Sequence, residues 1–255
     1  MKIAVCIKQV VTREWQLRVN DTNTWIRDSD ASFELNEPDA YALEEALRLK
    51  EKHGGEVVVC CAGPARATQV IREALARGAD RAIHVEGDAL ASADAATAAG
   101  ALAAAIRDEQ FELVLTGLQS DDQGFGQVGV ILAERLSVPH ATIIMEVQAD
   151  PGQRSLRVKR ELEGGWFQWI VLPLPALLTI QSGINQLRYA TLKGIMAAKK
   201  KEIRKVPFAA AAEATQRIVA MYAPEKGKKT HMIGGSAAEA ARELVTRLRD
   251  DARVI

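Results

Sequence analysis

The sequence predicts an α/β protein with a doubly wound, mostly parallel sheet, a small β-hairpin addition and an extended C-terminal arm. Short, uninterrupted apolar runs, typical of strands buried on both faces, alternate with segments of helical period over residues 3–145. Repeated strand–helix units imply parallel strands with helices on both faces. The chain has 255 residues, enough for one large domain or for a domain with an appendage.

Composition excludes several classes of protein. Lys plus Arg and Asp plus Glu both number 33, so the formal net charge is zero, which argues against a whole-chain nucleic-acid binder. Hydrophobic content is 48%, as in ordinary globular proteins. Three cysteines form no disulfide framework and suit a reducing compartment. The sequence shows neither a membrane-span pattern nor a targeting segment, so we expect a cytoplasmic protein without membrane insertion.

The N-terminal region predicts a strand, a hairpin and a helix in that order. Residues 3–7 are all apolar and predict the first strand, and the turn-rich segment 15–27 predicts a small hairpin. Asn36 is placed as the N-cap of the next helix, with Asp39 completing an imperfect capping box. This helix ends at residues 53–55, His-Gly-Gly, because glycine favours the helix C-terminus.

Further strands and helices alternate up to residue 145. Apolar runs predict strands, and amphipathic or alanine-rich stretches predict helices. The expected strands are residues 56–61, 81–85, 113–116 and 140–145, and the expected helices are residues 65–77, 92–108 and 125–136.

The pattern changes after residue 150. Two runs, 156–162 and 166–172, flank the segment Glu-Gly-Gly at 163–165, which predicts a β-hairpin. Residues 176–180 return to an apolar strand.

The last third of the chain has little periodic core. It is rich in Arg, Lys and Ala and is interrupted by Pro and Gly until a final helix expected at 236–250. We therefore expect an α/β domain over residues 1–183 and, over residues 184–255, an arm that needs another surface to pack on.

The most informative stretch is the glycine-rich loop 117–129, which follows the strand expected at 113–116. Glycines let a backbone approach a phosphate closely, and the helix N-terminus beyond them supplies N–H donors. Gly124–Gly129 also matches G-x-G-x-x-G, but it follows the fourth strand rather than the first, after a polar insert. This position favours a phosphate-binding loop, with a plain connection as the alternative, over an NAD fingerprint. Asp121 and Asp122 are expected to accept a hydrogen bond from a ribose hydroxyl or to cap the helix.

Two other loops of polar or small residues, Lys8-Gln9 and residues 62–64, follow expected strands. Ligands of open α/β sheets bind outside the carboxyl ends of the strands. Each loop alone is an ordinary turn, but three converging loops suit a mononucleotide.

No catalytic or metal-binding constellation is recognisable. There is no nucleophile elbow and no Walker lysine, and the histidines lack metal-ligand spacing. The cysteines are interpreted as small buried hydrophobes rather than nucleophiles. This pattern favours a binding or carrier role over an enzyme. The four histidines are His53, His84, His140 and His231, and the three cysteines are Cys6, Cys60 and Cys61.

A positively charged run covers residues 199–201 and includes Arg204 and Lys205. Its default interpretation is a solvated helix face, and the alternative is a docking patch for an acidic partner. The preceding residues 187–196 mix apolar side chains with Arg and Tyr, as interface anchors do.

Several motifs together resemble the β subunit of electron transfer flavoproteins. The likeness covers almost the whole chain. The matching segments are residues 158–165 with 172–179, 36–39 before 42–46, 63–64, 76–81 and 188–192.

The resemblance implies a heterodimer in which the α subunit holds most of a redox FAD. The β subunit then holds a structural AMP in a Rossmann-like, adenine nucleotide-binding domain, and its recognition loop and arm pack on partners. Electrons from a flavin-containing dehydrogenase pass through the FAD to a downstream acceptor. The resemblance implies no catalytic residue and no nucleic-acid partner for this chain.

The family's functional residues carry over onto two groups of positions. Leu192 matches the anchor of the recognition loop, which docks dehydrogenases. The implied AMP contacts are Cys6, Asn36, Glu37, Pro38, Asp39, Ala62, Gln119, Ser120, Asp121, Asp122, Gln123, Gly124, Phe125, Gly126, Gln127, Val128, Gly129 and Val130, and the implied partner contacts are Tyr189, Leu192, Ile195 and Met196.

Two positions depart from the family pattern. Bifurcating members, whose β subunit binds a second FAD, carry a small residue where this chain has Phe125, and the bulk of Phe125 favours AMP. Arg13 stands where related chains carry an aromatic residue near the flavin, which weakens the case for a flavin contact there. The alternatives are a bifurcating-type subunit with a second FAD, an NAD-dependent oxidoreductase using Gly124–Gly129, and an ATP-responsive regulatory protein.

Overall fold

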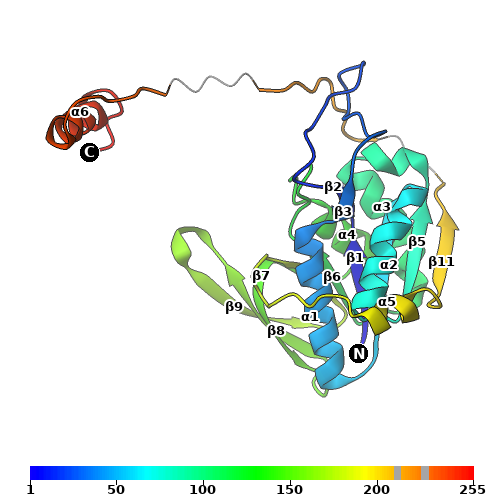
Figure 1. Cartoon of the computed structure of the whole chain (residues 1–255). Coiled ribbons are helices and arrows are strands. Elements are labelled where there is room, and N and C mark those ends of the chain that lie inside the picture. Colours follow the sequence, from blue (N-terminus) through cyan, green and yellow to red (C-terminus); the bar gives the residue numbers. More distant parts are fainter. Residues whose placement is uncertain (210–213, 225–229) are drawn as a thin grey trace. The chain divides into compact units, whose positions relative to one another are not determined.

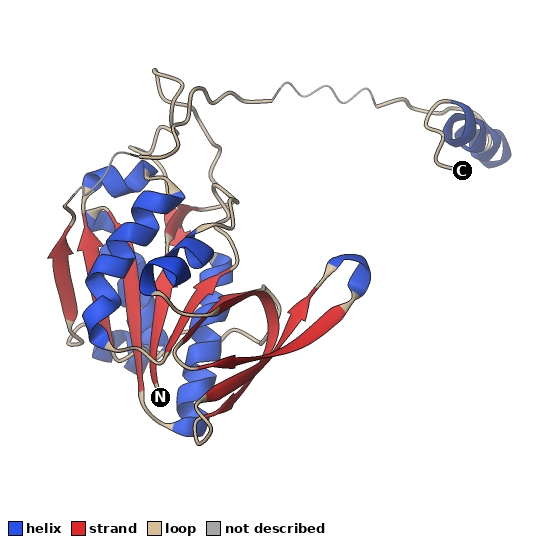
Figure 2. Ribbon diagram, turned by 180° about the vertical axis from the view of Figure 1, so that it is seen from behind, coloured by secondary structure: helices blue, strands red, loops and turns tan. Residues whose placement is uncertain are grey.

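The computed structural model describes residues 1–209, 214–224 and 230–255. They form two compact units, Met1–Met221 and Tyr222–Ile255. The larger unit is built on one nine-stranded sheet with helices on both faces (Figures 1 and 2), which confirms the predicted fold class.

The sheet has the strand order β11-β5-β4-β1-β6-β10-β7-β8-β9. All pairs from β11 to β7 are parallel, whereas β7, β8 and β9 pair antiparallel and extend from the parallel part in Figure 1. The strands are β1 Lys2–Ile7, β4 Glu56–Gly63, β5 Arg81–Glu86, β6 Leu113–Gly117, β7 His140–Asp150, β8 Ser155–Glu161, β9 Phe167–Pro173, β10 Ala176–Ile180 and β11 Ile203–Pro207. A separate short pair joins β2 Gln9–Val11 to β3 Phe33–Leu35.

Two helices pack on each face of the parallel part. Alternate residues of each central strand point to opposite faces, so that β1 directs Ile3 and Val5 to one helix layer and Ala4 and Cys6 to the other. The first layer contains α1 Glu37–His53 and α2 Thr68–Arg77, and the second contains α3 Ala95–Ile106 and α4 Val128–Leu136. Short 3₁₀ helices lie at Ala65–Ala67, Asp88–Ser92, Arg107–Glu109 and Glu163–Gly165.

Three predicted helices begin later than expected. The helix expected from residue 65 starts with the 3₁₀ turn Ala65–Ala67 and becomes α-helical at Thr68. The helix expected from residue 125 begins at Val128, because Gly124 and Gly126 adopt φ of +66° and +63° and hold the loop out of helical geometry. The helix expected from residue 92 begins at Ala95, where the Asp94 side chain accepts the N–H of Thr97 at 2.8 Å. The hairpin expected at 15–27 contains a single bridge, between Val19 and Ile26.

The predicted domain boundary at residue 183 lies inside the larger unit. Beyond it, α5 Leu192–Ala198 packs on α2, and β11 adds an edge strand beside β5. Gly194 allows the close approach of α5, because a Cβ there would lie 2.3 Å from the carbonyl oxygen of Ala76. The described residues between 184 and 221 therefore belong to the α/β unit. Residues 210–213 and 225–229 of the predicted arm lie outside the described residues.

The second unit contains α6 Ala237–Asp250, at the place predicted for the final helix. Its N-terminus has a complete capping box, in which Ser236 Oγ accepts the N–H of Glu239 and Glu239 Oε2 accepts the N–H of Ser236 at 2.8 Å. Leu244 and Val245 are exposed on this helix. None of the described helices is both long and apolar enough to cross a membrane.

The cysteines are buried, as interpreted from the sequence. Cys60 and Cys61 have no exposed surface, and Cys6 has almost none. Burial raises the pKa of the Cys60 and Cys61 thiols to about 12, which removes them from nucleophilic chemistry at neutral pH.

Candidate nucleotide-binding site

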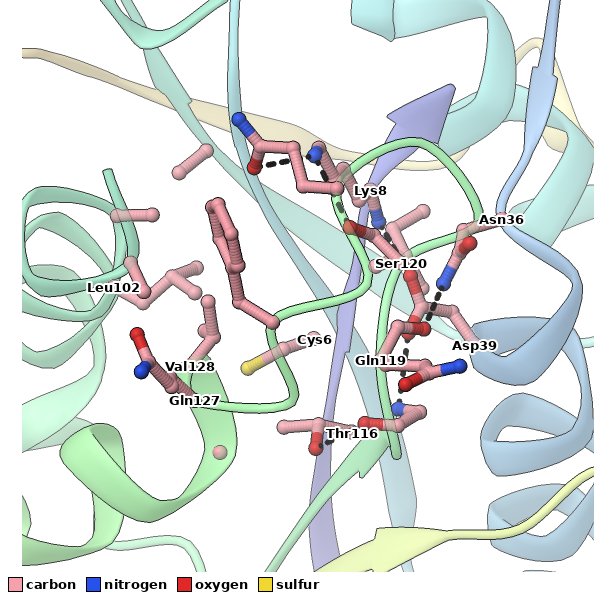
Figure 3. A pocket seen from close by; sticks show the side chains of 18 of the residues that line it. Cys6, Lys8, Asn36, Asp39, Leu102, Thr116, Gln119, Ser120, Gln127 and Val128 are labelled. Carbon is pink, nitrogen blue, oxygen red and sulfur yellow. Dashed lines mark hydrogen bonds between the residues drawn. The ribbon is translucent and has the colours of Figure 1, made fainter. Parts of the chain in front are cut away.

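A pocket opens at the carboxyl ends of β1, β4 and β6, between these strands and the N-terminal ends of α3 and α4 (Figure 3). It holds about 820 Å³ of empty space, open solvent included. The sequence-predicted residues that line it are Cys6, Asn36, Asp39, Ala62, Gln119, Ser120, Gln123, Phe125, Gly126, Gln127, Val128 and Gly129. The predicted residues outside its lining are Glu37, Pro38, Asp121, Asp122, Gly124 and Val130.

Several lining residues were missing from the predicted set. Lys8 belongs to a loop that the sequence placed at this edge, and Asp94 carries an N-cap signal that could have been used. The small residues of α3 carry no such signal. The missed residues are Ile7, Lys8, Leu90, Ala91, Ala93, Asp94, Ala95, Ala98, Leu102, Thr116, Gly117 and Leu118.

Asp39 joins the ends of two strands beneath the pocket. The N–H of Lys8 donates to Asp39 Oδ2 at 2.8 Å, and the N–H of Gly117 donates to Asp39 Oδ1 at 2.9 Å. A Cβ at Gly117 would lie 2.5 Å from Asp39 Oδ1, so this approach requires glycine. The carboxyl group is 6% exposed, and burial raises its pKa to about 7 although the N–H donors oppose the shift.

Asn36 holds the glycine loop rather than its own helix. Its Nδ2 donates to the carbonyl of Gln119 at 3.0 Å, and its Oδ1 accepts the N–H of Asp121 at 2.9 Å. Asn36 does occupy the N-cap position, but the predicted capping box with Asp39 is wrong, because neither side chain makes a cap hydrogen bond to the described residues of α1. Pro38 in the first turn lacks one of the two N–H groups from which an N-cap side chain can accept.

The two acidic loop residues, Asp121 and Asp122, are not part of the pocket lining. Asp121 Oδ2 lies 3.4 Å from the N–H of Glu37, at the start of α1, and 3.1 Å from Nη2 of Arg13. Asp122 Oδ1 accepts from Nζ of Lys8 at 2.7 Å. Asp121 therefore meets a helix N-terminus, one of the two roles expected for it, although the helix is α1 rather than α4.

The three glycines of Gly124–Gly129 have different tasks. Gly124 and Gly126 supply the left-handed turns of the loop, and Gly129 brings α4 onto the sheet. A Cβ at Gly129 would lie 2.5 Å from Thr179 Cγ2 and 2.9 Å from Thr116 Oγ1. The N-terminal turn of α4, whose N–H groups lack intrahelical partners, is thereby fixed at the pocket edge.

Asp94 connects the pocket with the end of the larger unit. Besides capping α3, its Oδ2 accepts the N–H of Thr215 at 2.6 Å, the Thr215 hydroxyl at 2.7 Å and the N–H of Gln216 at 2.9 Å. Burial alone would raise the pKa of Asp94, but these donors hold it well below its usual range. In the described part of the chain, no group of three or more His, Cys, Asp or Glu side chains is arranged to hold a metal ion.

A family model described as the electron transfer flavoprotein domain matches residues 24–211. The chain belongs to the electron transfer flavoprotein family. This match confirms the resemblance found in the sequence.

Curated relatives cover nearly the whole chain. An electron transfer flavoprotein subunit beta from Methylophilus methylotrophus is 38% identical over 96% of this chain and 97% of its own length. The Bacillus subtilis protein of that name is 34% identical, and the mitochondrial one of Oryza sativa subsp. japonica is 36% identical, both over the full length of the two chains.

The four residues predicted as partner contacts are exposed. Tyr189 is 88% and Leu192 78% exposed, and Ile195 and Met196 are exposed beside Leu192 on α5. Arg188 holds this segment on α1, because its Nε donates to Glu44 Oε2 at 2.7 Å. These four apolar side chains therefore share one surface segment without belonging to the core.

The positively charged run after this segment is mostly engaged within the fold. Lys201 Nζ donates to the carbonyls of Leu75 and Ala79 at the end of α2, and Arg204 and Lys205 pair with Glu109 and Glu86. Lys199 and Lys200 are exposed. The default interpretation of the whole run as a solvated helix face is wrong, because much of the run caps α2 and lies on β11.

Proposed function

We propose that this chain is the β subunit of a heterodimeric, non-bifurcating electron transfer flavoprotein and that its pocket holds a structural AMP. The observation that carries the proposal is the pocket between β1, β4 and β6, which a glycine loop and the N-terminal turn of α4 close. The printed names of the relatives, subunit beta, support a partner α subunit.

In this proposal the chain binds AMP and docks the dehydrogenase, and it contributes no catalytic residue. FAD, bound mainly by the α subunit, supplies the redox chemistry between a flavin-containing dehydrogenase and a downstream acceptor. Asp39 and Asn36 hold the loops that surround AMP, and Leu192 presents an apolar anchor to the dehydrogenase. Phe125 lines the pocket, and its bulk there supports AMP rather than a second FAD.

The test is to release and identify bound nucleotides after denaturing the purified chain, alone and in complex with its α subunit. We expect AMP from this chain in both samples and FAD only with the partner. Stoichiometric FAD on the isolated chain would contradict the AMP assignment, and turnover of a nicotinamide cofactor without a partner would favour the oxidoreductase alternative.

We expect Leu192→Ala to slow electron transfer from the dehydrogenase about tenfold, because truncating an apolar anchor costs about 1–2 kcal/mol of docking energy. Flavin content stays unchanged because Leu192 is 78% exposed and outside the core. The measurement is dehydrogenase-driven reduction of the complex at limiting concentration.

The matched control is Leu17→Ala, since Leu17 is 67% exposed and lies outside the recognition loop. Equal slowing in both variants, or loss of flavin from Leu192→Ala, would contradict a docking role.

A further inference from the structure

Lys8 is the single cationic side chain among the described residues that line the pocket. Its ammonium group donates three hydrogen bonds among the described residues, all to the glycine loop. The acceptors are Asp122 Oδ1 at 2.7 Å, Gln123 Oε1 at 3.1 Å and Ser120 Oγ at 3.4 Å. Figure 3 shows the contact with Ser120. The one positive charge of the pocket is thus held at its rim by a carboxylate from outside the lining.

The other charged residues of the lining are Asp39 and Asp94, both acidic. Their oxygens accept N–H or hydroxyl groups of the chain itself and offer a ligand no positive charge. Arg13, which lies near the loop, is paired with Glu37 and Asp121. Among the described side chains of the lining, Lys8 is therefore the one that offers a phosphate a positive charge, beside the N–H groups at the start of α4.

The pair between Lys8 and Asp122 is weak enough to be exchanged. Both side chains are partly exposed, and pairs of this kind contribute only about 0–1 kcal/mol. A phosphate dianion brings more charge and more acceptor oxygens than one carboxylate, and charge-assisted hydrogen bonds to it are stronger than neutral ones.

We propose that Lys8 selects a nucleoside monophosphate over the free nucleoside in this pocket, and that the phosphate takes Lys8 from Asp122. Asp122 is then a competitor that lowers the affinity for the phosphate. This proposal rests on the proposed function, because it assumes that the pocket receives an adenine nucleotide.

The experiment measures dissociation constants of AMP and of adenosine by calorimetry, using the nucleotide-depleted complex with its α subunit. We expect Lys8→Met to weaken AMP binding about tenfold or more, as for loss of a hydrogen bond to a charged group, and to change adenosine binding less than about twofold. We expect Asp122→Asn to tighten AMP binding and to leave adenosine binding unchanged.

Two further variants serve as controls. Lys205, like Lys8, pairs with one carboxylate at 2.7 Å, that of Glu86, but it lies on β11 outside the pocket. Lys205→Met should therefore leave the binding of both ligands unchanged. Lys8→Arg retains the charge and should retain most of the preference for AMP. Thermal unfolding of each variant reports whether the fold is intact.

Equal weakening of AMP and adenosine by Lys8→Met would make Lys8 a tether of the loop and overturn the proposal. Unchanged AMP affinity would overturn it as well. If the unsubstituted complex binds neither ligand, the proposed nucleotide function itself fails, and the role of Lys8 fails with it.

Discussion

Asp39→Asn is expected to lower the free energy of unfolding by about 1–3 kcal/mol, the cost of leaving a buried polar group without its partner. The carboxylate accepts one N–H with each oxygen, from Lys8 and from Gly117. An amide has a single oxygen, so its NH₂ group would face one of these donors. Urea unfolding followed by circular dichroism measures the loss.

The loss caused by Asp39→Asn should also depend on pH. Burial raises the pKa of Asp39 to about 7, above its value in the unfolded chain, so the folded state binds the proton more tightly. The stability that this proton uptake contributes is complete below about pH 4 and disappears as the pH rises through 7. The substitution should therefore cost more at pH 5 than at pH 8.

The matched control is Asp108→Asn, which changes an exposed aspartate in the 3₁₀ helix Arg107–Glu109. It should alter stability by less than about 0.5 kcal/mol. A loss from Asp39→Asn that is as small as this would contradict the function of Asp39 as the tie between β1 and β6. A loss that grows between pH 5 and pH 8 would contradict the raised pKa of Asp39.

The second large effect is expected from Arg188→Met. Arg188 donates to both oxygens of Glu44, at 2.7 and 2.9 Å, and to Glu51 at 2.5 Å, while Glu44 is 5% exposed. Removing one partner of a buried ion pair costs about 3–5 kcal/mol, and the partial exposure of Arg188 reduces this to about 2–3 kcal/mol. Thermal or chemical unfolding measures this destabilisation.

The same substitution should slow electron transfer from the dehydrogenase, because Arg188 seats the segment that carries Tyr189 and Leu192. The double variant Arg188→Met/Glu44→Gln removes the unpaired buried charge and should recover much of the stability but not the transfer rate. Full recovery of the rate would show that Arg188 acts on stability alone.

Hydrophobic pattern predicted most of the fold because the elements of this chain are locally consistent. The apolar runs that predicted strands at residues 3–7 and 113–116 correspond to β1 and β6. The two runs that flank Glu-Gly-Gly at residues 163–165 predicted the hairpin of β8 and β9. In each case the signal lies within the segment itself.

Pairings between distant segments were not visible in this way. Nothing in residues 203–207 identifies β5 as the neighbour of β11, because the strand contains Arg204 and Lys205 and lies at the edge of the sheet. The boundary between the two compact units lies after Met221, whereas the sequence pattern placed a boundary at residue 183. Arg204 pairs with Glu109 and Lys205 pairs with Glu86 of β5, and both ion pairs depend on the tertiary structure.

The site was predicted where loops carry polar or glycine signals, and missed where small residues shape it. The glycine loop, Asn36 and Asp39 were predicted at the pocket, and they line it. The side chains of Asn36 and Asp39 bond to neighbouring loops instead of capping α1. Ala95, Ala98 and Leu102 of α3 are ordinary helix formers, and only the fold brings them to the pocket.

The position of β10 between β6 and β7 has a consequence for synthesis of the chain. β6 pairs with β10, which is made only after α4, β7 and the whole hairpin. At about 5–20 residues per second, a ribosome leaves one apolar edge of β6 without its neighbour for several seconds. The length of the segment from α4 to β9 thus sets how long the nascent chain must be protected from aggregation at this edge.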